Sequence, residues 1–139
     1  MKHLYLLHCV SEYPLPPEHA NLRVMDTLRA TFGHRATIGY SDHTIGIVAA
    51  VAAVAMGADV IEKHITLDKR LPGTDHVLSA DPDELAEMVR QIRLVETLRG
   101  APQKRLTSEE AKVQSFMRRR FSHAAQTRDL LISSRKEGG

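Results

Sequence analysis

The sequence predicts an α/β fold built on a parallel sheet. Three short apolar segments rich in strand-forming residues alternate with three segments whose apolar residues recur at helical spacing. Strands that alternate with helices pair in parallel through right-handed crossovers. Each predicted strand also ends in polar side chains, and chemistry in parallel α/β folds gathers at the carboxyl ends of the strands. The order β-α-β-α-β-α therefore predicts the fold class and the end of the sheet where a site would lie.

The first strand and the first helix are separated by a proline-rich loop. The run HLYLLHCV (residues 3–10) is apolar, and the three prolines of SEYPLPPEH then break it, which predicts a strand followed by a loop. From Glu18 onward apolar residues recur three or four positions apart, and Gly33 stands where a helix C-cap is expected. We therefore expect the first helix to begin near Glu18.

The second strand and helix follow directly. The segment ATIGYSD (residues 36–42) is predicted to be a strand, and the alanine-rich stretch from Thr44 to about Met56 a helix ended by Gly57. This stretch is the most apolar part of the chain, but it is too short to span a membrane and indicates a buried helix. No signal peptide is recognisable, so the sequence predicts a cytoplasmic protein with no membrane partner.

The third strand and the last helix are joined by a long loop. The segment DVIEKHIT (residues 59–66) is predicted to be a strand, and residues 67–80 a loop. In the last helix Asp81 is placed to be the N-cap, a proline follows it, and Glu84 completes a capping box. Apolar residues on one face continue this helix to Gly100.

Composition and charge exclude some classes of protein. The chain has 139 residues and a formal net charge of +2, and its basic residues are mixed with acidic ones, so no nucleic-acid partner is expected. The run Arg118, Arg119 and Arg120 is the local exception, and it is either a solvated face or a contact for phosphate or nucleic acid. The single cysteine, Cys9, excludes an internal disulfide and fits a reducing compartment.

Alternation along the strands predicts which polar side chains share a face. Residues two apart in a strand lie on the same side of the sheet. The residues with matching parity at the three strand ends are Cys9, Ser11 and Tyr13, then Gly39, Ser41 and His43, and then Val60, Glu62 and His64. Three neighbouring strands would thus contribute to one rim.

Two histidines occupy equivalent positions on this rim. His43 and His64, on adjacent parallel strands, can converge on one divalent cation and leave other coordination positions open for water and substrate. The alternative is that both are hydrogen-bonded core histidines. The other histidines considered lack this context and are interpreted as surface or structural residues: His3, His8, His19 and His34.

Acidic residues beside the histidines allow two interpretations. Asp42 and Glu62 either orient the histidines as second-shell partners or form ion pairs with Lys63 or Arg70. In the loop sequence PGTDH, Asp75 either caps a turn or hydrogen-bonds the hydroxyl groups of a polar ligand. Spacing alone leaves both questions open.

Four motifs together resemble a known family. The segments LLHCVSEYPLPPEHANL, IGYSDHTIGIVAAVAAVAMGADVIEKHITLD, PGTDH and LSADPDELAEMVRQIR are similar to the second half of the barrel of the sialic acid synthases, the N-acetylneuraminate synthase group with its legionaminate and pseudaminate relatives. The resemblance covers about Leu4 to Gly100, and the motifs keep the family's order and spacing. It implies the last three βα units of a (β/α)8 TIM barrel.

The resemblance also implies a reaction and a cofactor. The family is a group of transferases that condense phosphoenolpyruvate with an N-acetylated hexose such as N-acetylmannosamine, releasing phosphate and forming a nonulosonic acid. A divalent metal, Mn²⁺ or Mg²⁺, is bound by the histidines that match His43 and His64, and it acts as a Lewis acid on the sugar aldehyde. The matching residues imply that Ser11 and Ser41 contact phosphoenolpyruvate, and that Tyr13 and Asp75 hold the sugar.

The sequence also departs from the family pattern. Family members carry about five preceding βα units with phosphate-binding lysines, and an antifreeze-like domain after the barrel. We assign residues 1–100 to the C-terminal part of the barrel, and residues 101–139 to a linker and a truncated start of the antifreeze-like domain, where FMRRRFSHAAQTRDLL is similar to its opening. We expect a fragment that is inactive alone and forms a homo-oligomer such as a dimer, because its sheet edges would be unpaired. The alternatives are a catalytically dead remnant that acts as a binding module, and another metal-dependent aldolase.

Overall fold

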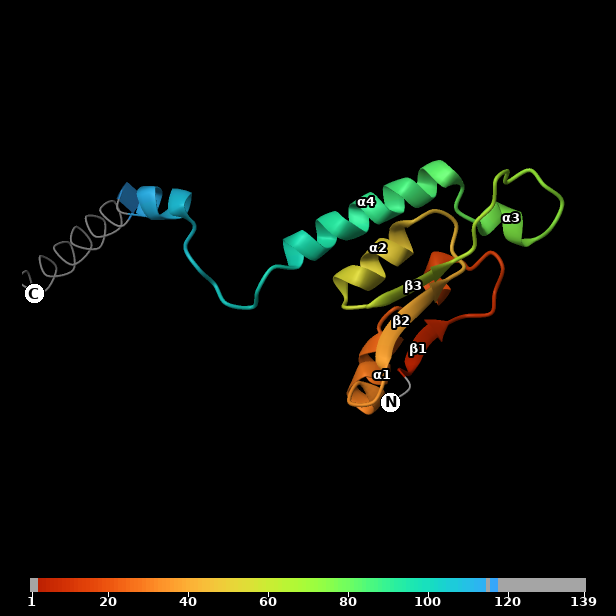
Figure 1. Cartoon of the computed structure of the whole chain (residues 1–139), viewed down its shortest axis with the longest axis horizontal. Helices are drawn as coiled ribbons and strands as arrows, with labels where there is room; N and C mark the ends of the chain where they lie inside the picture. Colours follow the sequence, from red (N-terminus) through yellow and green to blue (C-terminus); the bar gives the residue numbers. More distant parts are fainter. Residues whose placement is uncertain (1–2, 115, 118–139) are drawn as a thin grey trace, which may run out of the picture. The chain divides into compact units, whose positions relative to one another are not determined.

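The computed structural model describes residues 3–114 and 116–117. The chain divides into two compact units, Met1–Gly100 and Ala101–Gly139. The first unit contains the sheet and all of the labelled elements (Figure 1). They are, in order, β1 (Tyr5–Cys9), η1 (Pro17–His19), α1 (Val24–Phe32), β2 (Thr37–Asp42), α2 (Val48–Ala55), β3 (Val60–Lys63), α3 (Asp75–Leu78) and α4 (Pro82–Arg99).

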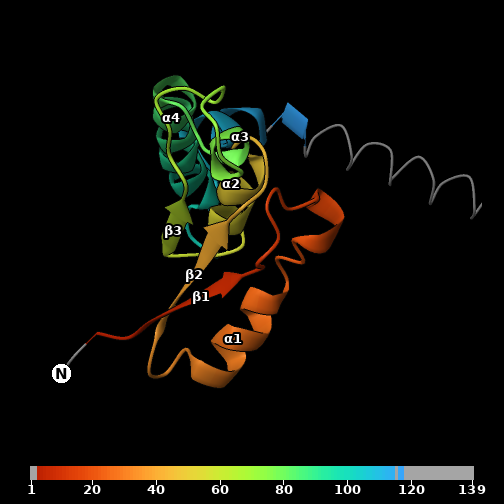
Figure 2. The same cartoon turned by 90° about the vertical axis from the view of Figure 1, so that its right-hand side faces the viewer.

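The sheet is parallel, which confirms the predicted α/β class. Its strand order is β1-β2-β3, and the register aligns Cys9 with Ser41 and Ser41 with Glu62. Helices α1 and α2 both contact β2, and α4 packs on α2 (Figure 2). The first unit is therefore a sheet with α1 and α2 packed on one face and α4 packed on α2.

The hydrophobic core lies between the sheet and the first two helices. It is centred on Ile38 and Tyr40 of β2, Met25 of α1 and Ala53 of α2, all of which are buried. Residues of the opposite parity in the same strands, such as Ser41, point to the other face. Alternation along the strands thus separates a core face from a face that is free to carry polar chemistry.

Helix α1 begins later than its apolar periodicity predicts. The chain forms a 3-10 turn at Pro17–His19, and α1 starts at Val24 rather than near Glu18. Asn21, with a φ of 40°, stands between the two elements. A non-glycine residue at positive φ interrupts helical geometry, which separates the turn from the helix.

The ends of the other predicted elements also differ. Helix α2 starts at Val48 because Thr44 instead forms a bridge with Leu15. Strand β3 ends at Lys63 because the next residues form hydrogen bonds with the segment before α4 instead of with β2. The His64 carbonyl accepts from Ala80 N–H (2.8 Å). The predicted loop 67–80 also contains the short helix α3.

Helix α4 matches its prediction from sequence. The Asp81 carboxylate accepts from Glu84 N–H (2.9 Å), and the Glu84 carboxylate accepts from Asp81 N–H (3.3 Å), which completes the capping box. At the other end of α4, Arg99 donates to the Val54 carbonyl at the end of α2 (3.2 Å). The Val54 carbonyl also accepts from Gly57 N–H (2.9 Å), so the guanidinium is a second donor at the C-terminal end of α2.

The second unit is described only in part. Residues 108–114 and 116–117 are helical. The arginine run and most of the segment compared with the antifreeze-like domain lie outside the described residues, so those assignments stay predictions. Of the helices in the described part of the chain, none combines the length and the apolar composition needed to span a membrane.

Candidate functional site

The candidate site begins with a hydrogen bond across two strands on the open face of the sheet. The Ser41 hydroxyl of β2 donates to the carboxylate of Glu62 on β3 at 2.6 Å. Ser41 is 2% exposed, whereas Glu62 is exposed. The register that aligns these residues therefore places a buried hydroxyl beside an accessible carboxylate.

Three aromatic rings meet at the ends of these strands. The rings of His43 and His64 have centroids 5.2 Å apart and meet edge to face. The Tyr13 ring lies 4.1 Å from His43 and 5.9 Å from His64, centroid to centroid. Tyr13 comes from the loop after β1, and a cis peptide bond joins it to Pro14. All three strands thus contribute to one cluster, as their parity predicts.

The orientation of His43 is fixed by the backbone. Its Nδ1 lies 2.7 Å from the Val10 carbonyl oxygen. A carbonyl can only accept, so Nδ1 carries a proton, and in the neutral ring the lone pair is on Nε2. The His43 carbonyl in turn accepts from Leu15 N–H at 2.9 Å. His43 is 3% exposed, which leaves the ring little freedom to turn away.

His64 has an acidic neighbour from the following loop. Its Nδ1 lies 3.7 Å from a carboxylate oxygen of Asp75, the first residue of α3. The Asp75 carbonyl accepts from the Ser79 hydroxyl (2.6 Å), which fixes the backbone of this short helix. About half of the Asp75 side chain stays exposed and accessible to a ligand. The structure therefore brings Asp75 to the histidine pair from a position distant in sequence.

Asp42 does not face the ring cluster. Its carboxylate is fully buried on the core side of the sheet and accepts from Lys63 Nζ (3.0 Å) and from Thr44 N–H (2.9 Å). The ion pair of Asp42 with Lys63 is therefore present, and among the described residues no hydrogen bond joins the Asp42 carboxylate to either histidine ring. An indirect role of Asp42 in orienting the histidines stays a prediction. Arg70, the other candidate partner, pairs instead with Asp68.

Ser11 is exposed in the loop after β1. It is the central residue of a tight turn closed by Glu12 N–H and the Val10 carbonyl (3.0 Å). Within the described residues its side chain makes no hydrogen bond to the ring cluster. Glu12 also pairs with His19 (2.9 Å), and this carboxylate raises the pKa of His19. The pair spans the loop that carries Ser11 and Tyr13.

His8 confirms the structural interpretation given to it. It lies on the core face, where its Nε2 donates to the Ala20 carbonyl at 2.8 Å. Tyr40 is its neighbour across the strands, with ring centroids 5.8 Å apart. Burial raises the pKa of the Tyr40 hydroxyl, and the negative charge of Asp42 adds to the effect. These groups support the core and not the open face.

The donor set suits a divalent metal with an open coordination sphere. Two neutral imidazole nitrogens are good ligands for such ions, and a carboxylate near the second ring could orient it or bind through water. In the part of the chain that the structure describes, no three side chains of His, Cys, Asp or Glu are arranged to enclose a metal. The site is thus a two-histidine platform rather than a closed cage.

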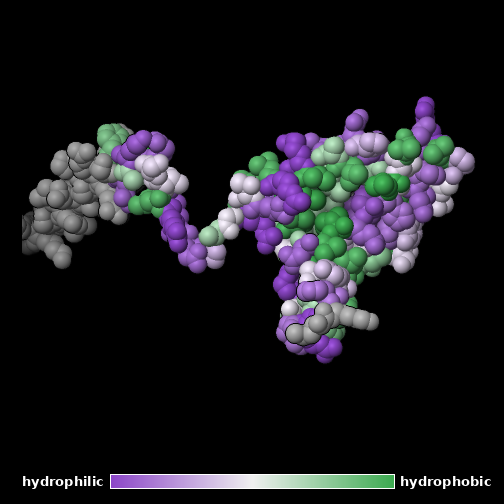
Figure 3. Space-filling view, in the orientation of Figure 1, coloured by the Kyte–Doolittle hydropathy of each residue, from purple (hydrophilic) through white to green (hydrophobic). Residues whose placement is uncertain are grey.

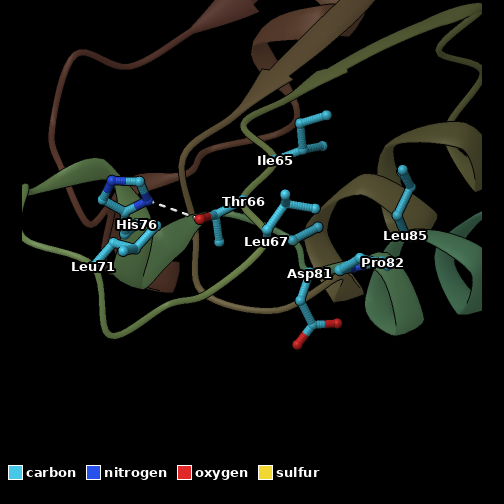
Figure 4. Close-up of a pocket in the computed structure, with 9 residues that line it drawn as sticks. Ile65, Thr66, Leu67, Leu71, His76, Asp81, Pro82 and Leu85 are labelled. Atoms are coloured by element: carbon cyan, nitrogen blue, oxygen red, sulfur yellow. Dashed lines mark hydrogen bonds between the residues drawn. The ribbon is translucent and has the colours of Figure 1, made fainter.

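A separate apolar cavity lies beyond the end of β3. It has a volume of about 450 Å³ and is walled largely by apolar side chains, among them Ile65, Leu67 and Leu85 (Figure 4). The polar contact drawn in it joins Thr66 and His76, with 2.8 Å between Oγ1 and Nδ1. Such a lining suits an apolar group and not a phosphate or a sugar.

Sequence patterns did not reveal two parts of this site. The Val10 carbonyl that orients His43 is a backbone group, and no residue type marks it. No residue pattern marks the contact of Lys63 with the Thr44 carbonyl either. The opposite parity of Lys63 and His64 is the sequence feature that indicates the core-side position of Lys63.

Comparisons with known proteins agree on one family. The family model described as NeuB family matches residues 1–104. The N,N'-diacetyllegionaminic acid synthase of Legionella pneumophila is 46% identical over 117 residues, covering 84% of this chain and 32% of the relative. The N-acetylneuraminate-9-phosphate synthase of Mus musculus is 55% identical over 100 residues, covering 72% of this chain and 28% of the relative.

A solved structure gives the same result. The N-acetylneuraminic acid (sialic acid) synthetase of Leptospira borgpetersenii superposes with a TM-score of 0.71 at 39% identity, over 81% of this chain and 39% of that chain. The chain therefore spans only about a third of the length of the curated relatives, whose shares are 32% and 28%.

Proposed function

This chain belongs to the NeuB family, and we propose that it carries the metal-binding and sugar-binding part of a nonulosonic acid synthase. Relatives that match most of the chain are named as synthases of sialic or legionaminic acids. The proposed reaction is the condensation of phosphoenolpyruvate with an N-acetylated hexose, with release of phosphate. The three βα units would then form the last part of a (β/α)8 barrel, with the site at the carboxyl ends of the strands.

The observation that carries this proposal is the ring cluster of His43, His64 and Tyr13. Two histidines with centroids 5.2 Å apart come from adjacent strand ends, and the Nε2 of His43 is left available by the bond from its Nδ1. A divalent ion held by the two rings would supply Lewis-acid polarisation of the sugar carbonyl. We propose Mn²⁺ or Mg²⁺ as this ion.

The other residues are proposed to bind and orient the substrates. Asp75, half exposed beside His64, is placed to accept hydrogen bonds from sugar hydroxyls, while Tyr13 offers a ring face and a hydroxyl at the rim. The Ser41 hydroxyl, held by Glu62, is proposed to contact phosphoenolpyruvate, together with Ser11 from the exposed turn. Glu62 orients Ser41 and thereby fixes where its oxygen is presented.

A second candidate function is a binding module without turnover. It is supported by the ion pairs of two cations that the sequence places near the strand ends: Lys63 is buried against Asp42, and Arg70 is exposed and paired with Asp68. A phosphate group at the rim would find neither of them free. Metal binding fits both candidates, whereas phosphate release separates them.

Metal titration tests the proposed site directly. Addition of Mn²⁺ to the ¹⁵N-labelled chain should broaden the NMR signals of His43 and His64 first, because paramagnetic relaxation acts most strongly on the nearest nuclei. His43→Ala and His64→Ala should each weaken Mn²⁺ binding at least about tenfold, since each removes one of the two protein ligands. Calorimetry measures the affinity.

The matched control is His8→Ala, which removes a histidine on the core face. It should leave Mn²⁺ affinity unchanged, although it costs stability by freeing the Ala20 carbonyl. The metal site is wrong if His43→Ala and His64→Ala bind Mn²⁺ as tightly as the parent chain. Equal broadening of all histidines would also contradict it.

The exposed edges of the sheet lead us to propose self-association of the chain. Strands β1 and β3 are the two edges of the sheet, and apolar side chains gather over the region of α2, β3 and α4 (Figure 3). Unpaired edges and apolar patches favour association. Sedimentation velocity should show a dimer or a larger species.

A charge on the apolar surface should reduce this association. Leu67 is 88% exposed close to β3, so Leu67→Lys should shift the chain toward monomer. Leu106, which is 54% exposed in the second unit, provides the matched control Leu106→Lys, and it should change little. A parent chain that stays monomeric at high concentration would contradict the proposal.

A further inference from the structure

A buried ion pair lies directly behind the ring cluster, on the core face of the sheet. The side chain of Asp42 is 0% exposed and that of Lys63 is 2% exposed, and Lys63 Nζ donates to the carboxylate at 3.0 Å. Charges in such surroundings are costly to bury and are retained only where further hydrogen bonds satisfy them. Those further bonds show what the pair holds.

The remaining hydrogen bonds of the pair converge on Thr44. Its N–H donates to the second carboxylate oxygen of Asp42 (2.9 Å), and its carbonyl accepts from Lys63 Nζ. Both peptide groups that flank the Thr44 Cα are therefore held from the core side. One of them is the peptide that joins His43 to Thr44.

The same stretch is held from the other side by the loop after β1. The His43 carbonyl accepts from Leu15 N–H (2.9 Å), and Leu15 and Thr44 form a parallel bridge. The His43 ring bonds to the Val10 carbonyl of that loop (2.7 Å). The backbone position of His43 thus depends on the ion pair behind it and on the loop beside it.

We propose that the Asp42–Lys63 pair is a positioning device for His43. By clamping both peptide groups of Thr44, the pair fixes the backbone so that the His43 Nδ1–H meets the Val10 carbonyl and Nε2 is left available. Asp42 and Lys63 are positioning residues, because they touch neither ring and act through the backbone. The metal part of this inference rests on the proposed function, whereas the ring orientation does not.

Imidazole tautomers provide a test that needs no metal. Long-range ¹H–¹⁵N spectra distinguish a ring protonated at Nδ1 from one protonated at Nε2. In the parent chain His43 should be a single Nδ1–H tautomer. The double variant Asp42→Asn/Lys63→Met removes both charges while leaving side chains of similar size, so neither charge is left buried alone. His43 should then populate both tautomers, and Mn²⁺ affinity should fall about tenfold.

Arg99→Met is the matched control for lost stability. Arg99 caps the end of α2 and has no contact with Thr44 among the described residues, so this variant should unfold at lower denaturant while His43 keeps its single tautomer. Asp42→Asn alone is the second variant for use if the double variant does not fold. It keeps an acceptor for Thr44 N–H and the size of the side chain, but it leaves the Lys63 charge buried without a counter-ion and so costs stability as well. A minor second tautomer should appear in its folded state.

The outcomes separate the clamp from the metal site. The proposal is overturned if the double variant folds and keeps both the single Nδ1–H tautomer and the parental Mn²⁺ affinity. If only Asp42→Asn folds, a single tautomer in that variant overturns it. If the parent chain binds no Mn²⁺ and the double variant still loses the single tautomer, the positioning role of the Asp42–Lys63 pair is supported and the proposed function is contradicted. Loss of the single tautomer in Arg99→Met would show that instability alone frees the ring, which also overturns the proposal.

Discussion

Gly39→Ala is expected to lower the free energy of unfolding of the first unit by about 3 kcal/mol. A Cβ at this position would lie 2.4 Å from the Val60 carbonyl oxygen and 2.4 Å from Cδ2 of Leu7. The leucine could turn aside, but the carbonyl belongs to the backbone of β3 and cannot move without loosening its pairing with β2. Denaturant unfolding followed by circular dichroism measures the change.

Gly46→Ala is the matched control for this prediction. Gly46 has a φ of 83°, and nothing lies within 4 Å of a Cβ built there. Its substitution should therefore cost only the backbone strain of a left-handed alanine, about 1 kcal/mol. Equal losses for the two variants would show that β2 and β3 do not approach as closely as the structure has them.

The missing side chain at Gly39 also shapes the candidate site. Gly39 lies on the same face as Ser41, two residues further along β2, and has the same parity as His43, which follows the end of β2. The close approach of β2 to β3 at this point precedes the Ser41–Glu62 hydrogen bond of 2.6 Å. A side chain that separates the strands should therefore weaken that bond as well as the fold.

The fold was predictable where local chemistry decides it. The capping box of Asp81 and Glu84 fixed the start of α4 because both partners lie within one turn. The start of α1 and the end of β3 were not predictable in the same way. Both depend on non-local or conformational features: a positive φ at Asn21, and a backbone bond from Ala80 to His64.

The candidate site was predictable to the extent that it follows strand parity. Parity alone places Ser41, His43 and Glu62 on one face, and the structure has them there. Parity also puts Asp42 on the opposite face from Ser41 and His43, but the burial of Asp42 against Lys63 depends on the helices packed over the core face. The proximity of Asp75 to His64 also required the path of a long loop, which spacing does not define.

The 139-residue chain, assayed alone with phosphoenolpyruvate, N-acetylmannosamine and Mn²⁺, is expected to release no detectable phosphate. Phosphoenolpyruvate carries several negative charges, and a catalyst must meet them with preorganised cations. Here Lys63 is committed to Asp42 on the opposite face, and Arg70 to Asp68. Each missing electrostatic contact costs about 3 kcal/mol of transition-state stabilisation, so the loss of several removes measurable turnover.

Turnover should appear when the chain is fused to, or mixed with, the part of a related synthase to which none of this chain aligns. The Legionella pneumophila synthase is a suitable donor because 84% of this chain aligns to it. The same assembly with His43→Ala is the control and should be inactive, since the added part does not replace this proposed metal ligand. Phosphate release by the chain alone, lost on His43→Ala, would contradict the prediction. The phosphate-binding cations would then have to come from this chain itself, and Lys63 or Arg70 could serve only after leaving the carboxylate that now holds it.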